Sequence, residues 1–322
     1  MGDIDKGTLP RLSEEIKNSY YEQGAWREET LVDLFEWAVD EHPDSKIVGP
    51  KRTVTYQELA EEVRRVSAGL RDLGIESGDV VSYQLPNWVT TNVFHLAISR
   101  LGAIANPIIP IYRRSEVSYI LENSGSKCIV VPDGAGDFDY PGMVEEIATD
   151  IPDLEHAVVV GDDPGLQGDI QSMPYDDLAS TVVGEPIDTA VGADDLHALL
   201  YTSGTTADPK GVVHTHNTAL FELRRTIELL GLSSETTIFM PSPVTHVTGM
   251  LYALELPFTR GMDLVLMAQW DPGEAVELVE EHDCNLTIGA TPFLQGMTEE
   301  VPDDWDSPLR VFGCGGADIP PE

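Results

Sequence analysis

Short apolar runs alternate along this chain with longer amphipathic segments. The apolar runs are bounded by Gly, Pro, Asn or Asp, which is typical of buried strands. In the longer segments apolar residues recur every three or four positions, which is typical of helices that bury one face. Strands that alternate with helices in this way predict an α/β fold with mainly parallel sheets.

In the first half of the chain, several segments begin or end at residues that favour helix termini. Thr30 precedes one segment, Thr55 and Glu58 form a capping box for the next, and Gly74 ends that second helix. Residues 107–110, with a proline at each end, are expected to form a rigid extended link. The predicted helices are 29–40, 55–74, 89–101 and 115–125, and the predicted strands are 53–54, 79–85, 128–131 and 157–160.

The alternation resumes after residue 195, which divides the chain into three parts. These are a surface segment, 1–28, a first α/β subdomain, 29–195, and a second α/β subdomain, 196–322. Residues 161–195 are rich in Gly, Asp and Pro and are expected to include a surface crossing between the subdomains. The predicted strands are 196–200, 237–240, 264–267, 286–288 and 309–312, and the predicted helices are 216–230, 247–258 and two segments that begin at 271 and 291.

The chain is strongly acidic. Its 322 residues include 56 Asp and Glu against 19 Lys and Arg, a net charge of −37. Nucleic acid and anionic lipid bind basic surfaces, so neither is expected as a partner. The acids are spread along a chain that is 42% hydrophobic, which favours a folded protein over an acidic tail. Mutual repulsion at this charge favours a high-salt cytoplasm, with an acidic protein of ordinary salt as the alternative.

Cysteine usage and hydropathy bear on the compartment. Cys128, Cys284 and Cys314 are far apart, and each lies in or beside an apolar run. This favours buried free thiols over a disulfide framework or a metal site. Residues 1–6 form no apolar signal segment, and no run of 18 apolar residues occurs. We therefore expect a soluble cytoplasmic protein without stable membrane insertion.

The loop Tyr201-Thr-Ser-Gly-Thr-Thr-Ala-Asp-Pro-Lys-Gly211 follows a predicted strand and combines hydroxyls, backbone N–H groups and one ammonium. Such a set of donors suits a polyphosphate. The spacing differs from a Walker P-loop, because five residues separate Gly204 from Lys210. Residues 212–214 read as extended, so we expect hydroxyls rather than a helix N-terminus to hold the phosphates. A plain surface turn is the alternative, because turns use the same residue types.

This string resembles the phosphate-binding signature of the adenylate-forming superfamily, which includes acyl-CoA synthetases, peptide-synthetase adenylation domains and firefly-type luciferases. The signature reads Y-T-S-G-T-T-G-x-P-K-G, and the chain departs from it at Ala207, where the family has glycine. The resemblance covers about residues 25–322 and implies the large N-terminal domain of such an enzyme. The residues that it assigns to the phosphates of ATP are Thr202, Ser203, Gly204, Thr205, Thr206 and Lys210.

A second segment in the family's order, 241–249, carries His246 and Gly249. The family places an aromatic residue or His here, between the acyl and nucleotide pockets. The resemblance therefore implies that His246 and Gly249 bind substrate, His246 through shape and hydrogen bonding rather than proton transfer. Taken alone, a His in such a loop is more often a packed or exposed bystander.

Two further turns follow predicted strands. Small residues there let a ligand approach the backbone, although tight packing turns use them too. The resemblance assigns the first turn and Gly313 to the substrate, and the end of the second turn to the nucleotide. The substrate residues are Gly289, Ala290, Thr291 and Gly313, and the nucleotide residues are Gly315, Gly316 and Ala317.

The resemblance implies a two-step reaction on a fatty or cyclic carboxylic acid. The acid attacks the α-phosphate of ATP and releases pyrophosphate, and coenzyme A then attacks the acyl-adenylate. ATP, Mg²⁺ and coenzyme A are the implied cofactors, and Lys210, Thr206 and His246 the implied catalytic residues. The wording around the later turns is closest to medium-chain fatty acyl-CoA synthetases and cyclohexanecarboxylate-CoA ligases.

The family pattern continues past Glu322 with a Glu that binds Mg²⁺, a ribose-binding Asp and a small C-terminal domain. These segments are not in the sequence, so we expect a fragment with little activity alone and a separate C-terminal half as a candidate partner. Three alternatives remain. They are a non-catalytic nucleotide- or acyl-binding module, a peptide-synthetase adenylation domain, and a structural or interaction protein.

Overall fold

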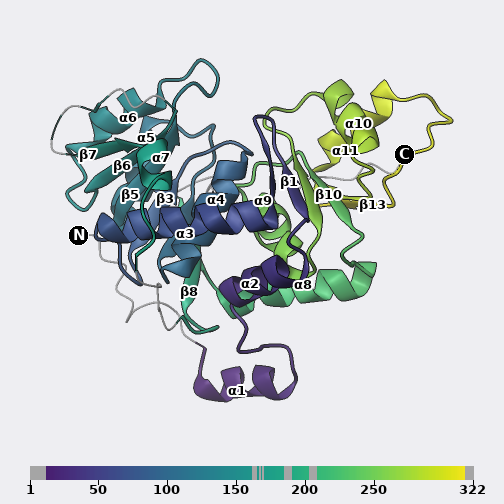
Figure 1. Ribbon diagram of the computed structural model, residues 1–322, viewed down its shortest axis with the longest axis horizontal. Helices are drawn as coiled ribbons and strands as arrows, with labels where there is room; N and C mark the ends of the chain where they lie inside the picture. The colour runs from purple at the N-terminus through teal and green to yellow at the C-terminus, as the bar shows by residue number, and fades with distance from the viewer. Residues whose placement is uncertain are drawn as a thin grey trace. The chain divides into compact units, whose positions relative to one another are not determined.

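The computed structural model describes residues 12–161, 165–166, 168, 170–184, 191–202 and 209–315. Within these ranges the chain forms two mostly parallel sheets flanked by helices, which confirms the predicted α/β class (Figure 1). The sheets belong to two compact units that interleave along the chain, which differs from the linear division at residue 195. The first unit is Met1–Asp33, Glu62–Leu85 and Phe94–Glu222, and the second is Leu34–Glu61, Pro86–Val93 and Leu223–Glu322.

The first unit contains a seven-stranded sheet in the order β7-β6-β5-β3-β4-β8-β9. All neighbours in it are parallel except β8 and β9, which form an antiparallel hairpin at one edge. Parallel neighbours need crossover connections, which explains the helices between successive strands. The strands are β3 (Val80–Tyr83), β4 (Ile104–Pro107), β5 (Ser126–Pro132), β6 (His156–Val160), β7 (Gln171–Pro174), β8 (Leu196–Thr202) and β9 (Lys210–Thr215).

Helices of the first unit pack on this sheet through a shared apolar core. Val117 and Ile120 of one helix and Val144 of the next are fully or almost fully buried against Ile129 and Val131 of β5. Helices that lie within the unit are α1 (Glu14–Glu22), α5 (Arg114–Ser124), α6 (Tyr140–Ala148) and α7 (Tyr175–Ala179). Helices that run from residues of one unit into residues of the other are α2 (Leu31–Glu41), α3 (Tyr56–Asp72), α4 (Val89–Arg100) and α8 (His216–Leu230).

The second unit contains a six-stranded sheet in the order β13-β12-β10-β11-β1-β2, parallel except for β1 and β2. Phe239 and Val265 of its central strands are buried against Ala275, Val279 and Met297 of two helices. The strands are β1 (Lys46–Val48), β2 (Thr53–Thr55), β10 (Thr237–Met240), β11 (Asp263–Leu266), β12 (Leu286–Gly289) and β13 (Val311–Cys314). The helical segments are α9 (Val247–Gly249), the π-helix η1 (Met250–Glu255), the 3₁₀-helix η2 (Leu256–Thr259), α10 (Pro272–Glu281) and α11 (Thr291–Glu300).

Several predicted helix termini are confirmed by their hydrogen bonds. Thr55 and Glu58 form the capping box of α3, with Glu58 Oε2 accepting from the Thr55 backbone at 2.8 Å. Asp271 caps α10 by accepting from the Glu274 backbone. Gly125 ends α5 in the left-handed conformation, which costs glycine little. Local cap chemistry is therefore read correctly from this sequence.

Other local structure was not predicted. Within the predicted surface segment, residues 14–22 form α1, because the Ser13 side chain caps a short helix with two acidic residues in its first turn. Residues 104–107 form a buried strand, β4, and only residues beyond it link to α5. The first residue of α5 is Arg114 rather than a residue capped by Ser115. The segment 161–195 also contains β7 and α7, which were not predicted.

Burial of the thiols agrees in part with the sequence. Cys128 and Cys284 are buried free thiols, whereas Cys314 is only partly buried. Burial raises the pKa of both Cys128 and Cys284 to about 12, which keeps them protonated and unreactive.

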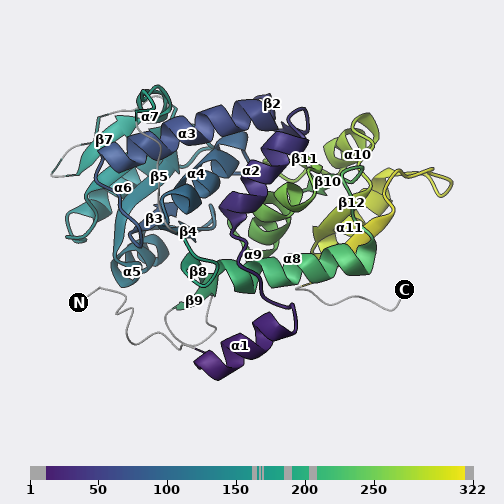
Figure 2. The same ribbon diagram turned by 60° about the horizontal axis from the view of Figure 1, so that its bottom comes forward.

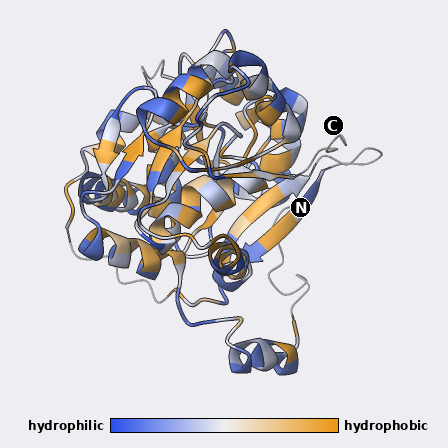
Figure 3. Cartoon of the chain, turned by 90° about the vertical axis from the view of Figure 1, so that its right-hand side faces the viewer, coloured by the Kyte–Doolittle hydropathy of each residue, from blue (hydrophilic) through white to orange (hydrophobic). Residues whose placement is uncertain are grey.

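The hydropathy of the chain follows the sheets. In Figure 3 the strands are mainly hydrophobic, and hydrophilic residues colour much of the helical surface and α1. None of the described helices combines the length and apolarity that crossing a membrane requires.

Candidate functional site

The signature loop grows out of the β8–β9 hairpin of the first unit. The two strands pair from Leu196 with Thr215 to Thr202 with Lys210. Thr202 and Lys210 are therefore direct cross-strand partners at the open end, and both are exposed. Residues 212–214 are extended, as predicted, so the loop does not lead straight into a helix. The hairpin presents a hydroxyl and an ammonium at the rim of the loop.

Packing beneath the rim fixes the hairpin laterally. The Tyr201 hydroxyl donates to Asn123 Oδ1 at 2.7 Å, and its ring packs edge-on against Tyr119. Burial raises the pKa of Tyr201, so this donor stays protonated. Gly211 leaves room for the ring, because an added Cβ would lie 3.4 Å from Tyr201 Cζ and 2.9 Å from Leu199 Cδ1.

Six predicted site residues lie outside the described residues. For the ATP-binding prediction this leaves Thr202, Lys210 and Gly315 with a described position. The six are Ser203, Gly204, Thr205, Thr206, Gly316 and Ala317.

His246 lies in the loop that follows β10 in the second unit. It is the N-terminal cap of α9, with Nδ1 accepting weakly from the Thr248 backbone at 3.4 Å. The side chain is exposed, yet nearby protein atoms displace enough water to lower its pKa by desolvation. A neutral imidazole with Nδ1 as acceptor carries its proton on Nε2. The loop therefore offers one N–H donor to a ligand.

A residue between the predicted strand 79–85 and the predicted helix 89–101 holds this loop. Asn87 is 4% exposed and donates through Nδ2 to the Ser242 carbonyl at 2.8 Å and the Met240 carbonyl at 3.3 Å. Its Oδ1 accepts from the Val244 backbone at 2.9 Å. The pattern Pro86-Asn87 marks a turn but gives no sign of these long-range bonds. Asn87 thus acts as a positioning residue for the His246 loop.

Gly249 is required by the same loop. A Cβ at this position would lie 2.2 Å from the Pro243 carbonyl oxygen and 2.5 Å from the Val244 Cα. Real Cβ atoms do not come so close to backbone. The predicted substrate residue Gly249 is therefore explained by tight packing, which leaves a ligand role for it as a proposal.

The other predicted corners lie at neighbouring strand ends in the same sheet. β12 lies between β10 and β13, and Gly289 pairs with Cys314. The Gly315 N–H donates to the Gly289 carbonyl at 3.2 Å, which extends the ladder past the strand ends. A Cβ at Gly289 would meet Phe293 at 3.0 Å and Ser242 Oγ at 3.1 Å. The structure thus brings the predicted second-unit residues to one carboxyl edge, where α/β sheets bind ligands: His246, Gly249, Gly289, Ala290, Thr291, Gly313 and Gly315.

Two threonine hydroxyls at this edge are buried and have hydrogen-bonding capacity left over. Thr245 is 2% exposed and Thr291 is 5% exposed. Among the described residues, neither Oγ1 has a hydrogen-bond partner. Buried hydroxyls are rarely left so, and a polar ligand group would satisfy them. Donors of this kind fit an adenylate or a carboxylate.

Mg²⁺ fits this edge less well. No trio of carboxylate, imidazole or thiol groups close enough to share an ion lies at these strand ends in the described ranges. Mg²⁺ prefers carboxylate and phosphate oxygens in octahedral geometry. The implied ion is therefore given no role in the chemistry derived below.

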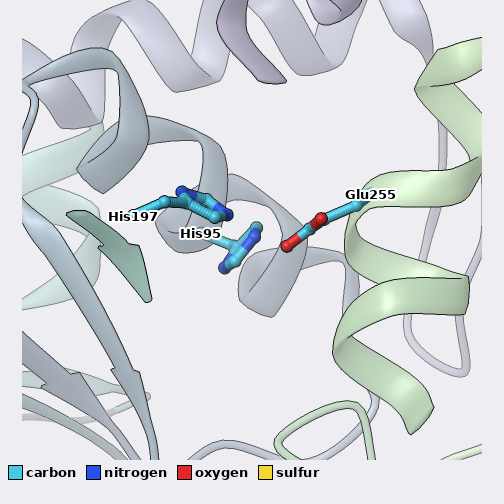
Figure 4. A group of neighbouring side chains, drawn as sticks. All are labelled: His95, His197 and Glu255. Atoms are coloured by element: carbon cyan, nitrogen blue, oxygen red, sulfur yellow. The ribbon is translucent and has the colours of Figure 1, made fainter. Parts of the chain in front are cut away.

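A stack of buried imidazoles occurs elsewhere in the first unit. His95 of α4 and His197 of β8 lie edge to face with ring centroids 5.1 Å apart, as Figure 4 shows. His197 stacks on His216 at 4.4 Å, and the Tyr83 hydroxyl lies 2.9 Å from His95 Nδ1. Glu255, also drawn in Figure 4, is a fully buried residue of the second unit. The sequence analysis singled out neither His95 nor His197.

These features define the class of protein. Two α/β units, each with mostly parallel strands and loops at their carboxyl ends, form a ligand-binding enzyme fold. The chain belongs to the family of AMP-binding enzymes, whose model matches residues 35–322. The predicted membership of the adenylate-forming superfamily is thereby confirmed.

Individual relatives include ligases of two kinds. The medium-chain fatty-acid–CoA ligase of Escherichia coli (strain K12) is 30% identical over 96% of this chain and 55% of its own length. The 2,3-dihydroxybenzoate-AMP ligase of Bacillus subtilis (strain 168) is 28% identical over 97% of this chain and 57% of its own length. The apo structure of Mycobacterium smegmatis MbtA shares the fold, with a TM-score of 0.87 at 24% identity over 97% of this chain and 56% of that chain. The chain thus spans somewhat more than half the length of these relatives.

Proposed function

We propose that this chain carries the ATP- and acid-binding part of an AMP-forming carboxylate–CoA ligase for a fatty or cyclic carboxylic acid. The observation that carries the proposal is the open end of the β8–β9 hairpin. There Thr202 and Lys210 pair across the strands, so the loop between them starts and ends at one hydroxyl and one ammonium. The 30% identity to a medium-chain fatty-acid–CoA ligase supports the choice of acid and thiol.

In the first half-reaction, the acid's carboxylate oxygen attacks the α-phosphorus of ATP. The bond from that phosphorus to the bridging oxygen breaks, and pyrophosphate leaves with the electron pair. The Lys210 ammonium stabilises charge that builds on the departing phosphates. The Thr202 hydroxyl donates a hydrogen bond at the same rim and orients the leaving group.

The second unit is proposed to hold the acyl and adenylate groups. The buried hydroxyls of Thr245 and Thr291 would donate to carboxylate or phosphate oxygens, and the small residues at 289–291 and 313–315 let those groups approach the backbone. The neutral His246 ring would border the acyl group and donate from Nε2 without taking up a proton. In the second half-reaction the coenzyme A sulfur attacks the acyl carbonyl and AMP leaves.

Nucleotide binding is the most direct test, because the chain spans only part of its relatives' length. Calorimetric titration with ATP is expected to show one site, and Lys210→Met is expected to weaken it about tenfold or more. Lys46→Met is the matched control, because Lys46 is an exposed lysine on β1. Equal ATP affinity in the Lys210→Met variant and the wild type would refute the proposal.

Acid-dependent pyrophosphate release then distinguishes the two kinds of ligase. Octanoate and cyclohexanecarboxylate are expected to outperform 2,3-dihydroxybenzoate, and coenzyme A is expected to accelerate AMP release. Preference for the aryl acid with no effect of coenzyme A would support aryl-AMP ligase activity, which the Bacillus subtilis relative represents. ATP binding without turnover on any acid, even with a separate C-terminal half supplied, would support a non-catalytic binding module.

A further inference from the structure

The N-terminal arm, residues 12–28, meets the base of the β8–β9 hairpin inside the first unit. Asp194 stands two residues before β8, and Asn217 follows β9 as the second residue of α8. Tyr21 reaches both from α1. In Figure 2 α1 lies beyond the ends of β8 and β9. The arm thus touches the hairpin at the end opposite the signature loop.

Three side chains close a hydrogen-bonded triangle there, which we call the base triangle. The Tyr21 hydroxyl donates to Asp194 Oδ1 at 3.1 Å. Asn217 Nδ2 donates one proton to the same Asp194 oxygen at 3.0 Å and the other to the Tyr21 hydroxyl at 2.9 Å. Each donor proton has one acceptor, so the geometry is fully satisfied.

Neighbouring bonds make the base triangle rigid. Asn217 is fully buried, its backbone N–H donates to the Ala193 carbonyl, and its Oδ1 accepts from the Arg27 backbone at 2.9 Å. Lys17 Nζ lies 3.6 Å from Asp194 Oδ2. Burial and the Asp194 charge raise the pKa of Tyr21 to about 12, so its hydroxyl proton is kept at ordinary pH.

Apolar packing does not duplicate the base triangle. A cavity of about 490 Å³ lies between the arm and the hairpin base, bordered by Trp26, Ile104, Leu196 and Val213. Its charged residues are already engaged, since Lys17 pairs with Asp194 and Asp195 accepts from the Gly192 backbone. The arm and the hairpin base are therefore joined by polar bonds on one side of this cavity.

We propose that the base triangle of Tyr21, Asp194 and Asn217 positions the phosphate-binding loop. It does so by clamping the start of β8 to the end of β9 at the base of the hairpin. This rests on the proposed function for its effect on ATP. Within the part of the chain that the structure describes, β9 is an edge strand whose only sheet neighbour is β8. The hairpin is six residue pairs long by its register span, roughly 20 Å, so a small tilt at the base displaces Thr202 and Lys210 at the tip. Tyr21, Asp194 and Asn217 are positioning residues, because they lie at the far end from the reacting groups.

The test compares Tyr21→Phe with Tyr20→Phe in the whole chain. Tyr20 is the adjacent residue on α1, 37% exposed, with its ring on Trp26. Tyr21→Phe removes one donor and keeps the ring, so the fold is retained. Hydrogen exchange of the β9 amides is expected to accelerate in Tyr21→Phe, and ATP affinity to fall roughly fivefold, because misplacement far from the chemistry weakens productive binding. Tyr20→Phe is expected to match the wild type in both.

The two readouts separate this proposal from the proposed function. Unchanged β9 exchange in Tyr21→Phe would overturn the clamp, whether or not ATP binds. Faster β9 exchange with wild-type ATP affinity would overturn the link from clamp to loop. If Tyr21→Phe accelerates β9 exchange but the wild type binds no ATP, the proposed function is overturned and the clamp still stands. A merely structural role would lower the melting temperature without a selective change in β9 exchange and ATP affinity, and would also overturn it.

Discussion

The two candidate binding regions are built in opposite ways. In the first unit, Thr202 and Lys210 stand exposed at the open end of an edge hairpin. In the second unit, Gly249, Gly289 and Thr291 are packed among neighbouring parallel strand ends, where an added methyl group at either glycine would meet other atoms. The first region offers exposed polar and charged groups at the end of a hairpin, and the second offers shape between packed strand ends.

This difference separates binding from stability. Substituting an exposed cation removes an interaction that exists only with ligand, so the fold should hardly respond. Substituting a packed glycine disturbs the fold before any ligand arrives. The two kinds of effect can be measured independently, by ligand titration and by unfolding.

The largest effect is expected from Gly249→Ala. Ala normally favours a helical position over Gly by about 1 kcal/mol, but here its Cβ would lie 2.2 Å from the Pro243 carbonyl oxygen. Relieving that overlap requires backbone movement, so we expect a loss of about 3 kcal/mol in the free energy of unfolding. Urea unfolding measures it.

Gly273→Ala in α10 is the control for that substitution. Its nearest neighbour would be Asp271 Oδ1 at 3.4 Å, an ordinary contact. Stability is expected to stay the same or rise slightly. Equal stability changes in Gly249→Ala and Gly273→Ala would show that the second region is not rigid.

Lys210→Met is expected to give the next largest effect, on activity alone. Loss of one charge-stabilising donor typically lowers turnover about 100-fold. Because the side chain is exposed, the free energy of unfolding should change by less than about 0.5 kcal/mol. Pyrophosphate release and thermal unfolding measured on the same sample check both parts. A large drop in melting temperature would show that Lys210 supports the fold as well as binding ligand.

Asn87→Ala should affect both the stability of the fold and the binding of the carboxylic acid. The substitution leaves the Val244 N–H and the Ser242 carbonyl of the His246 loop without this partner, whereas the Met240 carbonyl keeps its bond from the Met267 backbone. We expect unfolding to become about 2 kcal/mol easier and acid binding to weaken, because the loop loses its support. Asn285→Ala is the comparison, since Asn285 also bonds to backbone through both side-chain atoms, but to Thr237 and Glu235 rather than to the His246 loop. If Asn87→Ala and Asn285→Ala have equal effects, Asn87 does not position the His246 loop.

The sequence predicted the fold best where local chemistry decides structure. Thr55, Asp271 and Gly125 mark helix ends because caps depend on nearby residues, and their contacts in the structure agree. β4 was missed because its run, residues 104–107, ends in a proline, and prolines read as breakers. The structure tolerates Pro107 at the last position of that strand.

The candidate site was predicted only in part. His246 and the turn at 289–291 could be located because they follow strands, and strand ends of a parallel sheet share an edge. Asn87 could not, because its partners Met240, Ser242 and Val244 are more than 150 positions away. The linear division at residue 195 failed to anticipate units that interleave, since contacts between distant segments define them.

Salt should stabilise the fold and weaken the contribution of Lys210 to ATP binding. At a net charge of −37, repulsion destabilises the folded chain, and the screening length falls from ~10 Å at 0.1 M to ~3 Å at 1 M salt. The melting temperature is therefore expected to rise with KCl, while the factor by which Lys210→Met weakens ATP binding shrinks. Thermal scans and ATP titrations at both KCl concentrations measure this. A melting temperature that does not rise would contradict adaptation to high salt.

The smallest expected effect concerns the charge of His246. Desolvation lowers its pKa from 6.5, so the folded state resists the proton that the unfolded state accepts. The contribution to stability is complete above about pH 6.5 and is lost as pH falls through the lowered pKa. It is small because the side chain is exposed. Protonation also removes the Nδ1 acceptor that caps α9. Binding of the carboxylic acid substrate should therefore weaken over the same pH range. An NMR titration of His246 is expected to show a midpoint below 6.5. A midpoint at or above 6.5 would mean that nearby protein atoms do not exclude water from His246.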